Sequence, residues 1–302
     1  MGLPSIAPYP MPTAVDLPEN RVSWTVDPAR AALLIHDMQE YFLEAFDRAA
    51  EPIPALIANI TRLADAARAA GIPVIYTAQP PGQTLQQRGL LQDFWGDGIG
   101  RDPAEAAIVP ALAPHPGDIE LTKWRYSAFV RTGLHEELRA RGRDQLIITG
   151  IYAHIGCLTT ATQAFSEEVQ PFLVADALGD FSRLDHHMAL DYAARRCAVA
   201  TTVDTVLGQM AAAASSTAPA TAGGPIDVRG ALAALADEPL DDFADDDDLS
   251  DAGIDSIRLM GLITEWQRAG FAVTFEELAE EPTIAAWTEL LARRAVAATA
   301  AR

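Results

Sequence analysis

Short apolar segments alternate with helical patterns over the first two thirds of the chain. Between the segments, apolar residues recur at helical spacing, and glycines such as Gly71 and Gly142 end these patterns. The alternation predicts an α/β fold, a Rossmann-like three-layer arrangement with a parallel sheet and helices on both faces. Ligands of such folds bind beyond the carboxyl ends of the strands. The expected strands are AALLIH (31–36), PVIYTA (73–78), IELTK (119–123), QLIITG (145–150) and PFLVAD (171–176).

The last quarter of the chain, residues 227–302, shows helical spacing only. Its patterns are DVRGALAALAD, SIRLMGLITEWQRAG, TFEEL and TIAAWTELLARRAVAA, punctuated by Gly270 and Pro282. We expect a small four-helix bundle, of a size that can fold by itself.

An uncharged stretch, AAAASSTAPATAGGPI (211–226), joins the two regions. It has too few large apolar residues to build a core, and its composition is typical of a flexible linker. Its first alanines also suit the end of a preceding helix. We therefore expect one domain over residues 1–211, a linker over 212–226 and a second domain over 227–302.

The charge of the chain narrows the classes of partner. The net charge is −20, and residues 227–302 alone carry 17 acidic and 6 basic residues. Such a surface repels the phosphates of nucleic acids, so we expect no nucleic-acid partner. No apolar run reaches the length of a membrane span. The two cysteines, Cys157 and Cys197, form no CxxC pair, which is typical of proteins from a reducing cytoplasm.

Polar residues follow several of the predicted strands. Asp37 follows the first strand, Gln79 the second, Lys123 ends the third, and the turn GIYAHIGC follows the fourth. Each residue alone suits ordinary strand capping. Because the carboxyl ends of parallel strands lie on one edge of the sheet, together they predict a functional site there.

The segments DMQxxF after the first strand, Lys123, and GIYAHIGCxxTA resemble the isochorismatase-like hydrolase family, over about residues 20–210. Many members of that family use an Asp–Lys–Cys triad, and their cysteine falls where this sequence has Gly156. Cys157 comes one position later, and one step along a helix turns a side chain by about 100°. The resemblance is therefore to the isochorismatase branch, which lacks the nucleophilic cysteine.

The resemblance implies hydrolysis of the enol ether of isochorismate to 2,3-dihydro-2,3-dihydroxybenzoate and pyruvate. This reaction needs a positioned acid, because protonation of the methylene carbon creates an oxocarbenium ion that water captures. We expect Asp37 to be this acid, with its pKa raised by burial and by the substrate carboxylates and lowered by Lys123. We expect Lys123 to orient Asp37 and to bind a substrate carboxylate. Gly156 is expected to leave room for the pyruvyl group.

The resemblance also implies the lining of the pocket. Gln79, Arg88, Trp95 and Tyr152 are expected there, and Phe42 and Trp95 are candidates for walls around the substrate ring. The planar guanidinium of Arg88 suits a carboxylate, although its sequence context alone favours a solvated surface arginine. No metal is expected. His186 and His187, which lack a third ligand at metal spacing, read as a surface pair.

The segment DDLSDAGIDSIRLM (247–260) resembles the attachment motif of carrier proteins. In that family, a transferase joins 4′-phosphopantetheine to the serine, here Ser256, near the start of a helix that favours the added phosphate. The alternative is that Asp255 and Ser256 are an ordinary helix N-cap.

The two halves together resemble bifunctional isochorismatase–aryl carrier proteins of siderophore or related nonribosomal peptide biosynthesis. The implied partners are isochorismate, a phosphopantetheinyl transferase, an aryl-adenylating ligase and a nonribosomal peptide synthetase, and a homo-oligomer through the hydrolase domain is expected. Three alternatives remain open. The substrate is the 2-amino-2-deoxy analogue of isochorismate, the enzyme is a cysteine amidohydrolase that uses Cys157, or the first domain is a non-catalytic docking domain beside an active carrier.

Overall fold

The computed structural model describes residues 3–217, 228–233, 244–247, 249, 259, 262–263, 266, 271 and 273–300. The chain divides into two compact units, residues 1–213 and 214–302, and each is described by itself. Within the described part of the chain, no helix combines the length and the apolar character that a membrane crossing requires.

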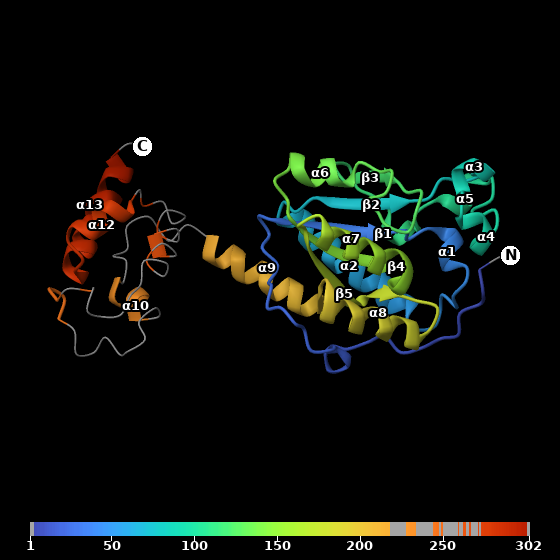
Figure 1. Cartoon of the computed structure of the whole chain (residues 1–302), viewed down its shortest axis with the longest axis horizontal. Helices are drawn as coiled ribbons and strands as arrows, with labels where there is room; N and C mark the ends of the chain where they lie inside the picture. Colours follow the sequence, from blue (N-terminus) through green and yellow to red (C-terminus); the bar gives the residue numbers. More distant parts are fainter. Residues whose placement is uncertain are drawn as a thin grey trace. The chain divides into compact units, whose positions relative to one another are not determined.

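The first unit is built on one six-stranded parallel sheet with the strand order β3-β2-β1-β4-β5-β6 (Figure 1). The five predicted strands are confirmed, and β5 extends further than expected. The sixth strand was missed, because the helix predicted over this stretch ends earlier and three residues then join the sheet edge. The strands are β1 (Ala31–His36), β2 (Val74–Ala78), β3 (Ile119–Thr122), β4 (Gln145–Ile151), β5 (Gln170–Gly179) and β6 (Val199–Thr201).

Helices cover both faces of the sheet, which confirms the predicted three-layer α/β architecture. α2 (Ile53–Ala69) and α9 (Val203–Thr217) share one core with Leu33 and Ile35 of β1. Leu34 of β1 points to the opposite face, because successive side chains of a strand alternate. That second core is completed by α6 (Leu134–Ala140), α7 (Leu158–Ser166) and α8 (Arg183–Arg196).

α9 reaches Thr217 and so enters the stretch predicted as a linker. Alanine has the highest helix propensity, so the alanines that begin this stretch continue the helix. The rest of the predicted linker lies outside the described residues.

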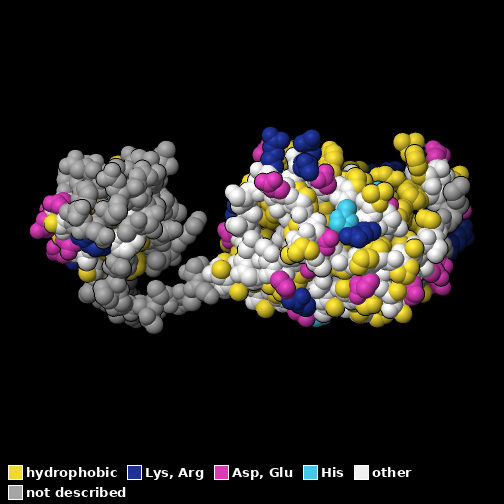
Figure 2. Space-filling view, turned by 90° about the horizontal axis from the view of Figure 1, so that it is seen from below, with side chains coloured by type: hydrophobic (Ala, Val, Ile, Leu, Met, Phe, Trp, Pro, Cys, Tyr) yellow, Lys and Arg dark blue, Asp and Glu magenta, His cyan; other side chains and the backbone are white. Residues whose placement is uncertain are grey.

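Short segments at the carboxyl edge of the sheet form the surroundings of the site. α1 (Glu40–Leu43) follows β1, and a turn of π-helix, η3 (Ala153–Cys157), follows β4. The long connection after β2 holds α3 (Leu85–Arg88), α4 (Leu91–Trp95), α5 (Pro103–Ala106) and η2 (Pro110–Leu112). On the face shown in Figure 2, acidic and basic side chains lie interspersed among hydrophobic ones.

Three described helices of the second unit have defined bounds. They are α10 (Val228–Ala233), α12 (Phe275–Glu280) and α13 (Ile284–Ala300). The core of this unit includes Trp266 and Trp287, whose rings pack edge to face with 6.1 Å between centroids. The Trp287 indole N–H donates to the Leu278 carbonyl oxygen at 2.9 Å, which satisfies this buried polar group.

Candidate active site

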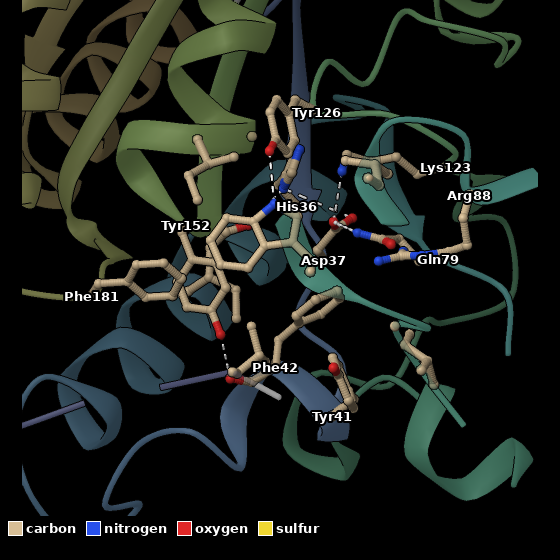
Figure 3. Close-up of a pocket in the computed structure, with 18 residues that line it drawn as sticks. His36, Asp37, Tyr41, Phe42, Gln79, Arg88, Lys123, Tyr126, Tyr152 and Phe181 are labelled. Atoms are coloured by element: carbon tan, nitrogen blue, oxygen red, sulfur yellow. Dashed lines mark hydrogen bonds and ion pairs between the residues drawn. The ribbon is translucent and has the colours of Figure 1, made fainter. Parts of the chain in front are cut away.

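A pocket opens at the carboxyl edge of the sheet, and side chains that follow five different strands line it (Figure 3). The structure brings all eight predicted hydrolase-site residues to this pocket. They are Asp37, Phe42, Gln79, Arg88, Trp95, Lys123, Tyr152 and Gly156. In Figure 3, Lys123, Gln79 and Arg88 lie on one side of Asp37, and Tyr152 and Phe181 lie on the other.

Asp37 occupies the first position after β1. Its φ of 49° is in the left-handed region, which Asp tolerates better than most residues. Its backbone N–H donates to the Thr77 carbonyl oxygen at 3.1 Å and so stays attached to β2. The carboxylate is 4% exposed and accepts three hydrogen bonds: Oδ1 from Thr77 Oγ1 at 2.7 Å, and Oδ2 from Lys123 Nζ at 2.8 Å and Gln79 Nε2 at 3.3 Å.

Lys123 provides the positive charge that pairs with the Asp37 carboxylate. It directly follows β3, and its backbone N–H donates to the Ala78 carbonyl oxygen at 2.8 Å. Burial raises the pKa of the Asp37 carboxyl, but the Lys123 ammonium and the hydrogen bonds outweigh burial and hold that pKa below its usual value. The Asp37 side chain is therefore a carboxylate at neutral pH.

Arg88 is a buried cation and not the surface arginine that its sequence context suggested. It is 3% exposed, and its Nε donates to the Gly96 carbonyl oxygen at 3.0 Å. Burial lowers the pKa of the guanidinium. Among the described residues, no carboxylate forms an ion pair with Arg88, so its terminal nitrogens are suited to an anionic ligand.

Aromatic side chains form the apolar part of the pocket. The Tyr152 hydroxyl donates to the Phe42 carbonyl oxygen at 2.9 Å, so this tyrosine presents its ring to the pocket. The Tyr152 ring packs against Phe181, with 4.4 Å between centroids. The Trp95 indole N–H donates to the Tyr126 hydroxyl at 2.7 Å.

Cys157 is not part of the pocket, and the cysteine-hydrolase alternative is therefore wrong. The side chain is fully buried within the core beneath α6, α7 and α8. Its Sγ lies 4.0 Å from the Thr149 carbonyl oxygen, and burial raises the thiol pKa, which opposes formation of a thiolate. The rotation of one helical step places this thiol outside the pocket, as predicted.

Two expectations need correction. Gly156 does not leave a free space for a pyruvyl group, because a Cβ built there would lie 2.2 Å from Cε1 of His36. The imidazole already fills this volume. His186 and His187 are also not a surface pair, since His186 is fully buried on the sheet-facing side of α8 and its Nδ1 lies 3.2 Å from the Tyr9 hydroxyl.

Sequence reasoning missed several lining residues. His36 is the last residue of β1 and reads as part of an apolar run, and Phe181 follows the true end of β5, which lies three residues beyond the predicted one. Tyr126 lies three residues after Lys123, so a search of the residues that follow each strand could have found it. Leu3 comes from the start of the chain, and nothing in its surroundings indicates the pocket.

Comparison with known proteins identifies both units. Residues 31–205 match the isochorismatase domain, and residues 227–291 match the phosphopantetheine attachment site domain. The chain belongs to the isochorismatase family. It is an isochorismatase, a hydrolase, joined to a domain that carries 4′-phosphopantetheine covalently. Ser256, the predicted attachment residue, lies outside the described residues.

The likeness to relatives extends over both units. The isochorismatase of Bacillus subtilis (strain 168) is 50% identical over 301 residues, which cover 97% of this chain and 96% of the relative. Enterobactin synthase component B of Escherichia coli (strain K12) is 44% identical over 293 residues, 97% of this chain and 99% of the relative. A cysteine hydrolase from Pseudomonas syringae pv. phaseolicola 1448A shares the fold at a TM-score of 0.57 and 26% identity, covering 65% of this chain and 98% of that one.

In the portion of the chain that the structure describes, no group of three or more His, Cys, Asp or Glu side chains could hold a metal ion.

Proposed function

We propose that the pocket hydrolyses isochorismate by delivering a proton from Asp37 to the methylene carbon of the enol ether. The observation that carries this proposal is a buried acid–cation pair, Asp37 and Lys123, in a pocket without a cysteine side chain. Protonation forms the new C–H bond and leaves an oxocarbenium ion. Water attacks that carbon, and the hemiketal breaks its bond to the ring oxygen, releasing pyruvate and the ring diol.

The proton starts on Lys123 in this proposal. Because Asp37 is ionised in the free chain, the Lys123 ammonium returns a proton to Asp37 Oδ2 across their 2.8 Å hydrogen bond. The two anionic carboxylates of the bound substrate favour this transfer, since they raise the pKa of the neighbouring Asp37 carboxyl. The attacking water later supplies the proton that restores the pair, so the proton balance closes in each turnover.

The remaining polar groups bind and orient the substrate. The guanidinium of Arg88 binds one carboxylate, because it is a buried cation that forms no ion pair with a carboxylate of the described residues. The Tyr126 hydroxyl accepts its hydrogen bond from Trp95 and therefore keeps its own hydrogen for a ligand oxygen. Phe42, Tyr152 and Phe181 form the apolar wall against which the substrate ring packs.

The second domain holds the aryl acid as a thioester on the phosphopantetheine arm, which we assign to Ser256. Its likeness to enterobactin synthase component B supports a role in siderophore assembly. An aryl-adenylating ligase loads the arm, and a nonribosomal peptide synthetase accepts the acyl group. Intact mass before and after treatment with a phosphopantetheinyl transferase, with Ser256→Ala as control, tests this assignment. A mass gain in Ser256→Ala would contradict it.

The hydrolase proposal is tested by following pyruvate release from isochorismate by the full chain and its Asp37→Asn variant. General acid catalysis contributes about 10²–10⁴-fold, so we expect a loss of turnover of this order. Asp118→Asn is the matched control, because the Asp118 side chain is only 5% exposed and also pairs with a cation, Arg68, but lies outside the pocket. Normal turnover by Asp37→Asn would refute the assignment of the acid.

A further inference from the structure

The imidazole of His36 occupies the place in which a side chain at position 156 would lie. A Cβ built on Gly156 would be 2.2 Å from Cε1 and 2.8 Å from Nε2 of His36. Both distances are shorter than a carbon side-chain atom tolerates, because contacts between such atoms are optimal at about 3.5–4.0 Å. Position 156 therefore accepts only glycine while His36 stays in place.

His36 has little freedom to move away. Its Nδ1 donates to the Ile151 carbonyl oxygen at 2.7 Å, and the side chain is 1% exposed. The backbone of His36 is held as well, because it pairs with Gly150 of β4, where an added Cβ would come within 2.2 Å of the His36 carbonyl oxygen. The ring is thus held from strands β1 and β4 at once.

Position 156 is also where a nucleophile would complete a catalytic set. The pocket already holds a carboxylate, Asp37, and the cation Lys123 that orients it. Gly156 lines the same pocket in the turn that leads into α7, whereas the neighbouring Cys157 faces the core. A nucleophile, a base and an orienting group within one pocket are the elements of covalent catalysis, and only the nucleophile is missing here.

We infer that His36 is the residue that determines the reaction type of this pocket. Its imidazole fills the volume that a nucleophilic side chain at 156 would need, so position 156 offers no covalent route and water is left to attack. His36 thus acts indirectly, as a positioning residue, because its ring prevents any side chain at position 156. The inference deepens the proposed function, but its tests use no isochorismate, so the two can fail separately.

The steric part of this inference predicts coupling between positions 36 and 156. Gly156→Ala and Gly156→Cys in the full chain should lower the melting temperature by about 5–10 °C, as overpacked cores do. His36→Val should remove most of this penalty when it is combined with either substitution, and His36→Ala serves as a second background if His36→Val folds poorly. Gly208→Ala on α9 is the control, because an added Cβ there meets nothing within 4 Å.

The chemical part predicts a new reactive thiol. The double variant His36→Val, Gly156→Cys should take up one more carboxamidomethyl group from iodoacetamide than the wild type, whose two cysteines are buried. In that step the thiolate sulfur bonds to the methylene carbon, iodide leaves, and the thiol proton passes to Asp37 or the buffer. Adding Asp37→Asn should slow this labelling at least tenfold, which a purely structural role of His36 would not cause.

The outcomes are decisive in both directions. The inference is supported if His36→Val reduces the loss of melting temperature caused by substitutions at position 156. It also requires that the new thiol of the double variant reacts faster with Asp37 present than with Asn at that position. A Gly156→Cys variant that is as stable as the wild type and labels equally fast with His36 present would overturn it. If Asp37→Asn does not change the labelling rate of the double variant, a thiol at position 156 is not activated by the pocket. That result would overturn the claim that His36 determines the reaction type.

Discussion

Two acid–cation pairs, one buried and one partly buried, lie at opposite edges of the same sheet. Asp37 and Lys123 meet at the carboxyl edge at 2.8 Å, and Asp118 and Arg68 meet at the amino edge at 2.7 Å. In both pairs the acid keeps a pKa below its usual value against the effect of burial. The cations differ in kind, because a lysine can give up its proton within a protein and an arginine cannot.

The surroundings of the pairs differ as well. Arg68 binds both oxygens of Asp118, and the His115 backbone N–H donates to the same carboxylate at 2.8 Å, while neither Arg68 nor Asp118 lines the pocket. Asp37 and Lys123 both line the pocket. The Arg68 guanidinium binds both oxygens of Asp118 and so connects α2 to the start of β3. The Lys123 ammonium, in contrast, contacts a pocket carboxylate to which it can transfer a proton. We therefore expect the Arg68–Asp118 pair to contribute to stability and the Asp37–Lys123 pair to take part in the proposed chemistry.

Exchanging the cations is the strongest way to break this comparison. Lys123→Arg keeps the positive charge but cannot return a proton to Asp37, so we expect kcat for isochorismate to fall about 10²–10⁴-fold with a smaller change in KM. The reverse exchange, Arg68→Lys, should leave kcat within about twofold, and melting temperatures of both variants check that each is folded. Wild-type kcat in Lys123→Arg would show that Lys123 supplies only charge.

The two acid–cation pairs and the buried histidines affect stability in different pH ranges. Burial lowers the pKa of His36 and of His186 to about 4. The unfolded chain binds these protons below its ordinary histidine pKa of about 6.5, so stability falls as the pH drops from about 6.5 to 4, by up to about 1.4 kcal/mol per pH unit for each histidine. Both aspartates stay charged through this window, because their folded pKa values lie below the unfolded ones and their contribution is lost only at lower pH.

Unfolding by denaturant at pH 7, 6, 5 and 4 measures this slope. His186→Gln, which removes a buried histidine outside the pocket, should reduce the slope by up to about 1.4 kcal/mol per pH unit. A slope unchanged by this substitution would show that other groups take up the protons.

Removing the structural pair should affect stability and not chemistry. Asp118→Asn loses the charge-assisted contacts with Arg68, and we expect about 1–2 kcal/mol of the free energy of unfolding to be lost. Urea unfolding measures this loss, and pyruvate release at 25 °C should remain near the wild-type rate. A loss of turnover larger than tenfold in a folded Asp118→Asn would contradict the division of roles.

The smallest effect is expected at the buried thiol. Cys157→Ala removes a side chain that does not line the pocket, so kcat should change by less than about threefold while the core loses some stability. Pyruvate release measures this, with Cys197→Ala as the control for a second buried cysteine. A loss comparable to that of Asp37→Asn would restore the thiol as a reacting group.

Local pattern predicted the elements and the site residues that follow strands, because strand ends of a parallel sheet share an edge. Asp37, Gln79 and Lys123 were found in this way. The short edge strand β6 was not predicted, because three residues are too few to show the alternation that distinguishes a strand from the preceding helix. The contact of His36 with Gly156 joins positions 120 residues apart, and no local signal reports that a glycine is required by a ring from another strand.

The burial of Arg88 could also not be read from its local sequence. Half of its neighbours in QTLQQRGLLQDFW are polar, and burial follows only when α3 and α4 fold beside the pocket. Family resemblance supplied this residue where physical reasoning on the sequence favoured the surface.

Proton delivery to carbon by the Asp37–Lys123 pair is the central claim, and a single-turnover reaction in D₂O tests it most directly. The claim predicts that pyruvate forms more slowly in D₂O than in H₂O, that its methyl group carries one solvent deuterium, and that acid-quenched protein has an unchanged intact mass. Pyruvate formation at equal rates in the two solvents, with a substrate fragment attached to the quenched protein, would contradict it.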